Sequence, residues 1–155
     1  MKRLDYPPIW LLGFMALAWT LSWALNWALA KVGLGFEVPF VLKLLGGVLI
    51  AIGLSLMALA VFAMLRHRTT VVPHRVPSAI VTDGVYRLTR NPIYLGDAFT
   101  LVGFSLLFAN SATVLLAPVF MAVIQKRFIV EEETWLRTKF PEEFQTWAEQ
   151  TRRWL

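Results

Sequence analysis

The sequence of 155 residues contains no cysteine, which excludes disulfide bonds, thiolate-bound metal ions and a cysteine nucleophile. Its two histidines, His67 and His74, are too few for a histidine-rich metal site, and we predict no bound metal. Charged side chains are scarce too, at 16% of the residues, against roughly a quarter in soluble domains. Because 57% of the residues are hydrophobic, a chain this short cannot hide its apolar surface from water, and we expect it to lie in a bilayer.

Four apolar runs are present, and each is expected to be a helix because backbone polar groups in lipid must be satisfied within the segment. We predict an all-α integral membrane protein, a single domain over 1–155, with four transmembrane helices at about 9–30, 39–65, 93–109 and 112–130. Asn110 and Ser111 form a turn signal between the last two runs, so these helices should make a tight hairpin. A loop at 66–91 and a polar, amphipathic helical element at 131–155 complete the chain.

The positions of the basic residues indicate an orientation. Thirteen of the 15 lysines and arginines precede the first run, lie between the second and third, or follow the fourth. The positive-inside rule then places both termini and the loop 66–91 in the cytoplasm, with the chain integral to the cytoplasmic membrane. The net charge of +5 does not indicate a nucleic-acid partner, because the basic residues flank apolar runs instead of forming one stripe.

The first run has a second possible interpretation, a cleaved secretory signal. Lys2 and Arg3 precede it, and the Ala-Leu-Ala sequence at 28–30 resembles a cleavage site. The run is longer than the apolar core of a signal, which has about 7–15 residues. Its four tryptophans also suit a retained anchor with interfacial aromatic residues; they are Trp10, Trp19, Trp23 and Trp27.

The segment 66–96 holds the first candidate site. It is rich in Arg, Pro and Tyr, and it enters the membrane at Asn91 and Pro92. Proline suits the first turn of a helix, and asparagine suits the N-cap before it. Free backbone N–H groups at that helix start could hold a carboxylate, with Arg90 and Tyr94 beside them. An ordinary capped helix behind a basic loop is the simpler alternative.

Asp97 lies about one turn inside the third run. An aspartate at the centre of a membrane helix costs about 2.5–3.5 kcal/mol, so an acid in this position is a functional candidate by default. A shallow carboxylate that pairs with Arg87 or Arg90 is the alternative. If the reaction requires a base, Asp97 or His74 could supply it, although a loop histidine is more often simply solvated.

Three consecutive acids, Glu131 to Glu133, follow the fourth run. Anionic headgroups would repel carboxylates at this place, so an ordinary surface helix does not explain them. They could instead bind the ammonium or hydroxyl groups of a cofactor, or pair with the nearby arginines. The aromatic residues after them recur mostly every three or four positions, as in an amphipathic helix. Pro141 predicts a break between two short helices.

Two blocks of the sequence resemble one superfamily. The first block is the segment from Thr82 to Gly96, which reads TDGVYRLTRNPIYLG. It resembles a Gly-x-Tyr-Arg turn followed by an Arg-(His or Asn)-Pro-x-Tyr-x-Gly motif. Both are typical of the isoprenylcysteine carboxyl methyltransferase and phospholipid methyltransferase superfamily. A second block of two acids, a leucine, spaced aromatic residues and a basic end resembles the same superfamily. It consists of Glu132, Glu133, Leu136, Phe140, Phe144, Trp147, Arg153 and Trp154.

The resemblance implies a membrane methyltransferase that uses S-adenosylmethionine and a lipid-like or otherwise membrane-accessible small substrate. It also implies a cofactor pocket between the cytoplasmic loop, the start of the third helix and the C-terminal element, with a tunnel from the bilayer. Asn91 stands where the isoprenylcysteine enzymes usually have histidine, which argues against a protein isoprenylcysteine as the substrate. The cofactor-binding candidates that the motifs carry over are Tyr86, Arg90, Asn91, Pro92, Tyr94, Gly96, Glu132 and Glu133.

The methyl acceptor stays open between a phospholipid amine, a carboxylate, and a thiol or other hydrophobic nucleophile. Two other classes of protein are alternatives to the enzyme. A non-enzymatic membrane scaffold could keep the fold without the cofactor, but the intact motif and the paired acids argue against it. A nicotinamide-dependent membrane reductase with a related C-terminal half usually has more helices than four apolar runs can supply.

Overall fold

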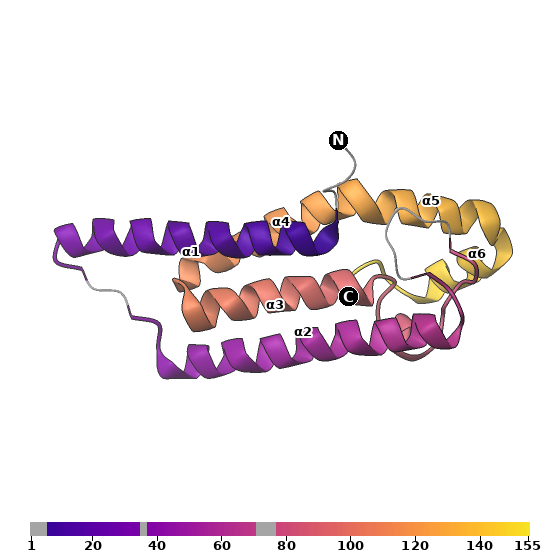
Figure 1. Ribbon diagram of the computed structural model, residues 1–155, viewed down its shortest axis with the longest axis horizontal. Coiled ribbons are helices and arrows are strands. Elements are labelled where there is room, and N and C mark those ends of the chain that lie inside the picture. The colour runs from indigo at the N-terminus through magenta and orange to yellow at the C-terminus, as the bar shows by residue number, and fades with distance from the viewer. Residues whose placement is uncertain (1–5, 35–36, 71–76) are drawn as a thin grey trace.

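The computed structural model describes residues 6–34, 37–70 and 77–155. Within these ranges every regular element is a helix (Figure 1). The elements are α1 (Pro7–Lys31), α2 (Phe40–Arg66), η2 (Gly84–Arg87), α3 (Pro92–Phe108), η3 (Ser111–Leu115), α4 (Leu116–Ile124), η4 (Gln125–Ile129), α5 (Val130–Lys139) and α6 (Pro141–Gln150).

Three helical stretches are long and apolar enough to cross a membrane, namely Pro7–Lys31, Phe40–Arg66 and Ser111–Lys139. The prediction of an all-helical membrane protein is confirmed at this level. α3 is also apolar but has 17 residues, fewer than the other three. The third stretch joins η3, α4, η4 and α5, so helical structure continues beyond residue 130, where the apolar run of the sequence ends.

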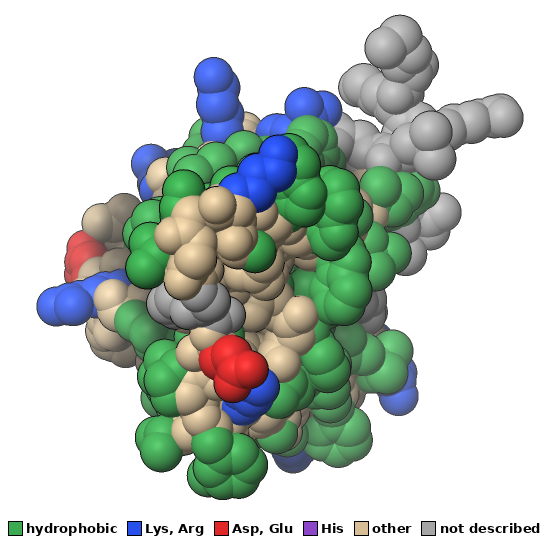
Figure 2. All heavy atoms as spheres, turned by 90° about the vertical axis from the view of Figure 1, so that its left-hand side faces the viewer, with side chains coloured by type: hydrophobic (Ala, Val, Ile, Leu, Met, Phe, Trp, Pro, Cys, Tyr) green, Lys and Arg blue, Asp and Glu red, His purple; other side chains and the backbone are tan. Residues whose placement is uncertain are grey.

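The large apolar side chains of α1 and α2 point mostly outward. Trp23 is 70% exposed and Phe40 is 78% exposed, whereas the buried residues of α2 are the small Gly46, Gly53 and Ala60. Figure 2 looks along the helices from the end where α1 is connected to α2, and it shows hydrophobic side chains around the bundle. This distribution suits a hydrocarbon solvent, in which apolar surface need not be buried and small residues mediate helix contacts.

α2 and α3 approach each other backbone to backbone at two places. A Cβ atom on Gly53 would lie 2.5 Å from the carbonyl oxygen of Gly96, and one on Gly46 would lie 2.7 Å from the carbonyl oxygen of Gly103. No real side chain fits at such distances, so both crossings require glycine. The small residues of these helices therefore place the start of α3 directly against α2.

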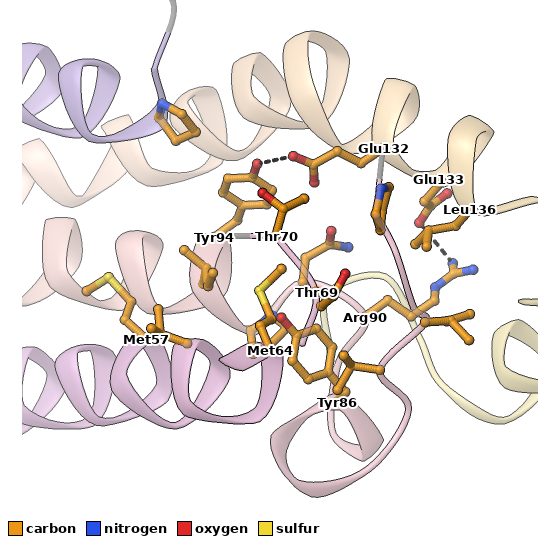
Figure 3. Close-up of a pocket in the computed structure, with 18 of the residues that line it drawn as sticks. Met57, Met64, Thr69, Thr70, Tyr86, Arg90, Tyr94, Glu132, Glu133 and Leu136 are labelled. Atoms are coloured by element: carbon orange, nitrogen blue, oxygen red, sulfur yellow. Dashed lines mark hydrogen bonds and ion pairs between the residues drawn. The ribbon is translucent and has the colours of Figure 1, made fainter. Parts of the chain in front are cut away.

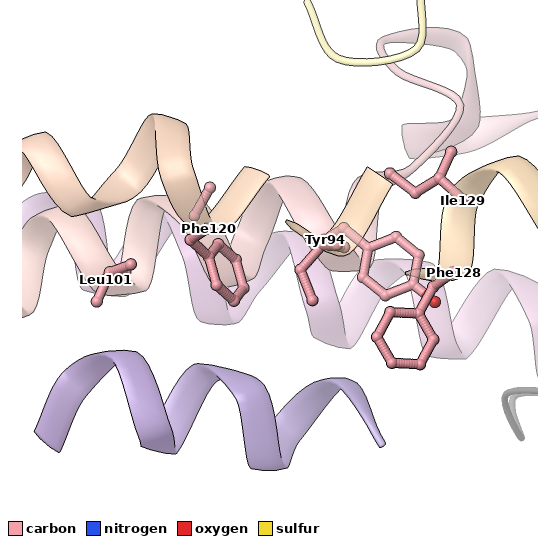
Figure 4. Packing of buried hydrophobic residues seen from close by; sticks show 7 residues of the cluster. Tyr94, Leu101, Phe120, Phe128 and Ile129 are labelled. Atoms are coloured by element: carbon pink, nitrogen blue, oxygen red, sulfur yellow. The ribbon is translucent and has the colours of Figure 1, made fainter. Parts of the chain in front are cut away.

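α3 is the central helix of the bundle. Eleven of its 17 residues are buried, against three in α1 and three in α2. Figure 1 shows α3 between α2 on one side and α1 with α4 on the other. An apolar cluster joins α3 to α4 and η4 (Figure 4) and consists of Tyr94, Ala98, Leu101, Phe120, Ile124, Phe128 and Ile129. Because the first turns of α3 are packed on both sides, the side chains there have fixed positions.

A two-residue turn, Ala109 and Asn110, connects α3 to η3. The Asn110 side chain accepts a hydrogen bond from the N–H of Ala112 and donates one to Oδ1 of Asn26 in α1, each at 3.0 Å. Asn110 is buried, so these bonds satisfy an amide that has no access to water. They also bind α1 to the turn at the end of the bundle that lies away from α6 (Figure 1).

The polar elements gather at the other end. η4 is a π-helical turn between α4 and α5, a local structure that is frequent near functional sites. α5 ends at Lys139 and α6 begins at Pro141, which is the break that the proline predicts. After α6 the chain turns back toward α3, and the N–H of Arg90 donates to the carbonyl oxygen of Arg152 at 2.9 Å.

Candidate functional site

A cavity of about 390 Å³ lies between the C-terminal half of α2, the start of α3 and α5 (Figure 3). Its volume is within the range of roughly 300–1,000 Å³ that is usual for small-molecule sites. Part of its wall is apolar and includes Met57, Val61 and Leu136, while carboxylate, guanidinium and phenol groups line another part. Apolar walls with a few convergent polar groups are typical of a ligand site.

The residues before α3 bring a short polar motif to the cavity. Asn91 occupies the N-cap position and Pro92 the first helical position, as the sequence predicts. The Asn91 side chain makes no capping bond, however. Its Nδ2 instead donates to the carbonyl oxygen of Arg153 at 2.9 Å, so Asn91 binds the C-terminal segment to the start of α3.

Arg90 lines the cavity, and 14% of its side chain is exposed. Its Nη2 lies 3.6 Å from Oε1 of Glu133, a long separation for an ion pair. Within the described residues, the buried Nε of Arg90 has no hydrogen-bond partner. A buried donor without an acceptor costs free energy, so this guanidinium retains capacity for an anionic group of a ligand.

Tyr94 and Glu132 meet across the cavity. The phenol of Tyr94 donates a hydrogen bond of 2.7 Å to Oε1 of Glu132 (Figure 3). The ring of Tyr94 packs on Phe128 of η4 with the ring centroids 6.3 Å apart (Figure 4). The phenol is therefore held on its apolar side by the core and on its polar side by a carboxylate.

Glu133 is bound to the C-terminal segment by a two-point ion pair. Nε of Arg153 lies 3.0 Å from Oε1 of Glu133, and Nη2 lies 2.6 Å from Oε2. This geometry is the strongest form of arginine–carboxylate pairing. Hydrogen bonding to Glu133 raises the pKa of the Arg153 guanidinium above its ordinary value, although partial burial acts in the opposite direction. The guanidinium of Arg153 is therefore charged at physiological pH.

Tyr86 belongs to η2 and reaches the cavity from the loop before α3. The indole N–H of Trp147 in α6 donates to the backbone carbonyl of Tyr86 at 2.9 Å, which fixes η2 against α6. Burial raises the pKa of the Tyr86 phenol, and the nearby Glu132 carboxylate raises it further. The phenol is therefore neutral, and it presents a ring face and a hydroxyl group to the cavity.

Asp97 lines the cavity and is 4% exposed. No ion pair joins it to Arg87 or Arg90 in the part of the chain that the structure describes. The alternative in which a shallow Asp97 pairs with one of these arginines is therefore not the observed arrangement. A buried carboxylate beside a cavity is instead available to a ligand.

The structure brings most of the sequence candidates together. Gly96 does not line the cavity, because its Cα faces Gly53 of α2. His74 lies outside the described residues. The candidates that line the one cavity are Tyr86, Arg90, Asn91, Pro92, Tyr94, Asp97, Glu132 and Glu133.

Sequence reasoning misses several residues that shape the site. Met57 and Met64 of α2 line the cavity but look like ordinary residues of an apolar helix. The Thr69 hydroxyl accepts from the N–H groups of Ser78 and Ala79, at 3.1 and 3.3 Å, and so holds residues 77–81 over the cavity. Arg153 belongs to the basic end of the second block. The block predicts that a basic residue is present there, but it does not predict the ion pair with Glu133.

A family model described as phospholipid methyltransferase matches residues 41–143 of this chain. The comparisons with curated proteins and with solved structures gave no match. The matched range extends over most of the chain and includes both groups of cavity residues, those at 86–97 and the acids at 132–133. The chain therefore belongs to the phospholipid methyltransferase family.

Proposed function

We propose that this membrane methyltransferase takes its methyl group from S-adenosylmethionine and transfers it to a lipid-like or other membrane-accessible small substrate. The observation that carries the proposal is the composition of one cavity, which unites a guanidinium with a free donor, three carboxylates and the phenols of Tyr86 and Tyr94. S-adenosylmethionine has a carboxylate, an ammonium group, ribose hydroxyls and a sulfonium cation, and each finds a complementary group there. Family membership supports the reaction class.

Arg90 is the residue suited to the carboxylate of the methionine part. Its Nε is buried without an acceptor among the described residues, and its Nη2 pairs only at long range with Glu133. A carboxylate bound by a guanidinium forms charge-assisted hydrogen bonds, which are stronger than neutral ones. The start of α3 adds a helix N-terminus without a side-chain cap beside Arg90.

Glu132 and the two tyrosines are suited to the positive and hydroxyl groups of the cofactor. Glu132 accepts from Tyr94, and a carboxylate has further lone pairs for an ammonium or hydroxyl group. An aromatic face stabilises a cation by about 0.5–2 kcal/mol. Tyr86 and Tyr94 offer such faces on two sides of the cavity (Figure 3).

The apolar part of the wall is suited to the methyl acceptor. Met57, Val61 and Met64 belong to a helix whose large apolar side chains mostly face outward. Pro7 and Pro8 at the start of α1 also line the cavity. A substrate with a hydrocarbon part can contact these residues without losing its apolar environment. The acceptor class, whether amine, carboxylate or thiol, is a matter for a substrate screen.

Methyl transfer requires little covalent chemistry from the protein. S-adenosylmethionine supplies an electrophilic methyl group on a sulfonium centre. The residues of this chain need to hold the acceptor in line with that methyl group and to exclude water. Asp97 is the described group best placed to accept a proton from an acceptor that carries one, and His74 is the second candidate.

The proposal includes an arrangement in the membrane. α3, which has 17 residues and is enclosed by its neighbours, joins the three longer helical stretches as a fourth membrane segment. The distribution of the basic residues supports cytoplasmic termini and a cytoplasmic cavity mouth, and the cytoplasm is where S-adenosylmethionine is available. α5, α6 and the C-terminal segment then lie at the cytoplasmic surface.

The direct test is calorimetric titration of detergent-purified protein with S-adenosylmethionine. We expect saturable binding by the wild-type protein and a roughly 10- to 100-fold weaker affinity for Arg90→Met, from the loss of charge-assisted hydrogen bonds. Arg87→Met is the matched control, because Arg87 is exposed in η2 and does not line the cavity. Absence of binding by folded wild-type protein, with and without added membrane lipid extract, would refute the proposal.

A further inference from the structure

The segment after α6 lies across the start of α3. Thr89 Oγ1 and Asn91 Nδ2 both donate to the carbonyl oxygen of Arg153, at 3.0 and 2.9 Å. The indole N–H of Trp154 donates to Oε1 of Gln125 in η4 at 2.9 Å. The last residues of the chain are thus bound to α3 and η4 at once, although Arg153 itself does not line the cavity.

The Arg153 side chain is the closer of two arginines that interact with the Glu133 carboxylate. Glu133 lies next to two arginines, and its side chain is 9% exposed. Arg153 occupies both carboxylate oxygens at 3.0 and 2.6 Å, whereas Arg90 approaches only one of them, at 3.6 Å. The nearly buried carboxylate is therefore neutralised from outside the cavity.

We propose that Arg153 is a positioning residue, which holds Glu133 so that the Arg90 guanidinium stays available for the carboxylate of S-adenosylmethionine. This inference rests on the proposed function. Without Arg153, the unpaired charge of Glu133 would draw the guanidinium of Arg90 into a close pair, since a nearly buried carboxylate requires a partner. Arg90 would then lose its free donor, and the anionic part of the ligand would meet an occupied site.

The test compares two probes that differ in one group, S-adenosylmethionine and its decarboxylated analogue. The dissociation constants of both are measured by calorimetry for the wild type, Arg153→Met, Arg153→Lys, Glu133→Gln and the double variant Arg153→Met with Glu133→Gln. Arg152→Met is the matched control, since the exposed side chain of Arg152 is adjacent to Arg153 in the sequence. Thermal unfolding of each ligand-free protein reports any loss of structure.

We expect Arg153→Met to weaken the binding of S-adenosylmethionine roughly 10- to 100-fold, and that of the decarboxylated analogue by less than about threefold. In the Glu133→Gln background the same substitution should change the affinity by less than about threefold, because the charge through which Arg153 acts is gone. Arg153→Lys retains the charge but not the two-point geometry, so its affinity should lie between those of the wild type and Arg153→Met.

Three results would overturn the inference: unchanged affinity in Arg153→Met, equal losses for both probes, or an undiminished loss in the Glu133→Gln background. Equal losses would indicate a purely structural role for the C-terminal segment. If Arg153→Met does not fold, the contrast between the two probes in Arg153→Lys decides the question. Failure of the wild type to bind S-adenosylmethionine would instead refute the proposed function, and this inference with it.

Discussion

The phenol of Tyr94 donates a hydrogen bond of 2.7 Å to Oε1 of Glu132. This bond joins the first turn of α3 to the first turn of α5, two elements that lie on opposite sides of the cavity. It keeps one oxygen of the carboxylate in place. The bond joins the two helices, and we propose that it also orients Glu132 toward a ligand.

Tyr94→Phe tests this orienting role, since it removes the hydroxyl group and keeps the ring. We expect the affinity for S-adenosylmethionine to fall roughly 3- to 10-fold, because Glu132 loses its neutral hydrogen-bond donor. Glu132→Gln should cause a larger loss, and the double variant should be no worse than Glu132→Gln alone. Calorimetry of the three proteins measures these effects, and additive losses would show that the two residues act independently.

Asp97→Asn tests whether the buried carboxylate serves the reaction or the fold. We expect methyl transfer to drop roughly 100-fold or more if Asp97 accepts a proton from the acceptor. The variant should be more stable by about 1 kcal/mol, because an amide costs less to bury than a carboxyl group that has no ion-pair partner among the described residues. The measurements are transfer of labelled methyl groups to membrane lipid extract and thermal unfolding. A variant with full activity and lower stability would indicate a structural role.

The glycine crossing between α2 and α3 predicts a contrast between two substitutions in the same helix. Gly53→Ala should lower the free energy of unfolding by roughly 1–3 kcal/mol, because its Cβ would lie 2.5 Å from the carbonyl oxygen of Gly96. Gly47→Ala should be neutral or stabilising by about 0.5–1 kcal/mol, since no atom lies within 4 Å of its Cβ position. Thermal unfolding in detergent checks both, and similar effects of the two substitutions would contradict this packing.

The proposed orientation can be tested through the absence of cysteine, which makes any introduced thiol the only one in the chain. Leu34→Cys and Thr82→Cys place exposed thiols at opposite ends of α2. In intact cells a membrane-impermeant thiol reagent should label the first and not the second. Permeabilised cells should show labelling of both. Labelling of Thr82→Cys alone in intact cells would reverse the proposed topology.

Much of the fold and the candidate site can be predicted from the sequence, because the relevant signals are local. Long apolar runs predict helices in lipid, and Asn91-Pro92 predicts the start of α3 within a residue. The acids at 132–133 and the motif at 90–94 are recognisable as short patterns, and the structure places them on one cavity. Each of these inferences needs only neighbouring residues.

The remainder depends on contacts that are distant in sequence. Gly96 belongs to the same motif as Tyr94, yet it faces Gly53 and not the cavity, which only the approach of α2 reveals. In the sequence, Arg153 looks like one more residue of a basic C-terminal segment, and its partner Glu133 is known only from the folded chain. The helix also continues to Lys139 beyond the last apolar residues, because a helix does not require apolar side chains to propagate once it emerges from the membrane.

The π-helical turn η4 has a consequence for the acids that follow it. Such a turn holds one residue more than an α-helical turn, and one residue corresponds to about 100° of rotation around the helix axis. Because of this extra residue, Ile129 and Glu133 lie on the same buried face of the helix as Phe120 and Ile124. Glu133 on this face lines the cavity. If Gln125–Ile129 formed a regular α-helix with no residue removed, the acids of α5 would be turned by about 100° relative to Phe120 and Ile124, away from Arg90 and Tyr94. The angle of α5 about its own axis, which η4 sets, therefore matters as much as the identity of the side chains. A chain that has both sequence blocks can assemble this cavity only if that angle points the acids toward α3.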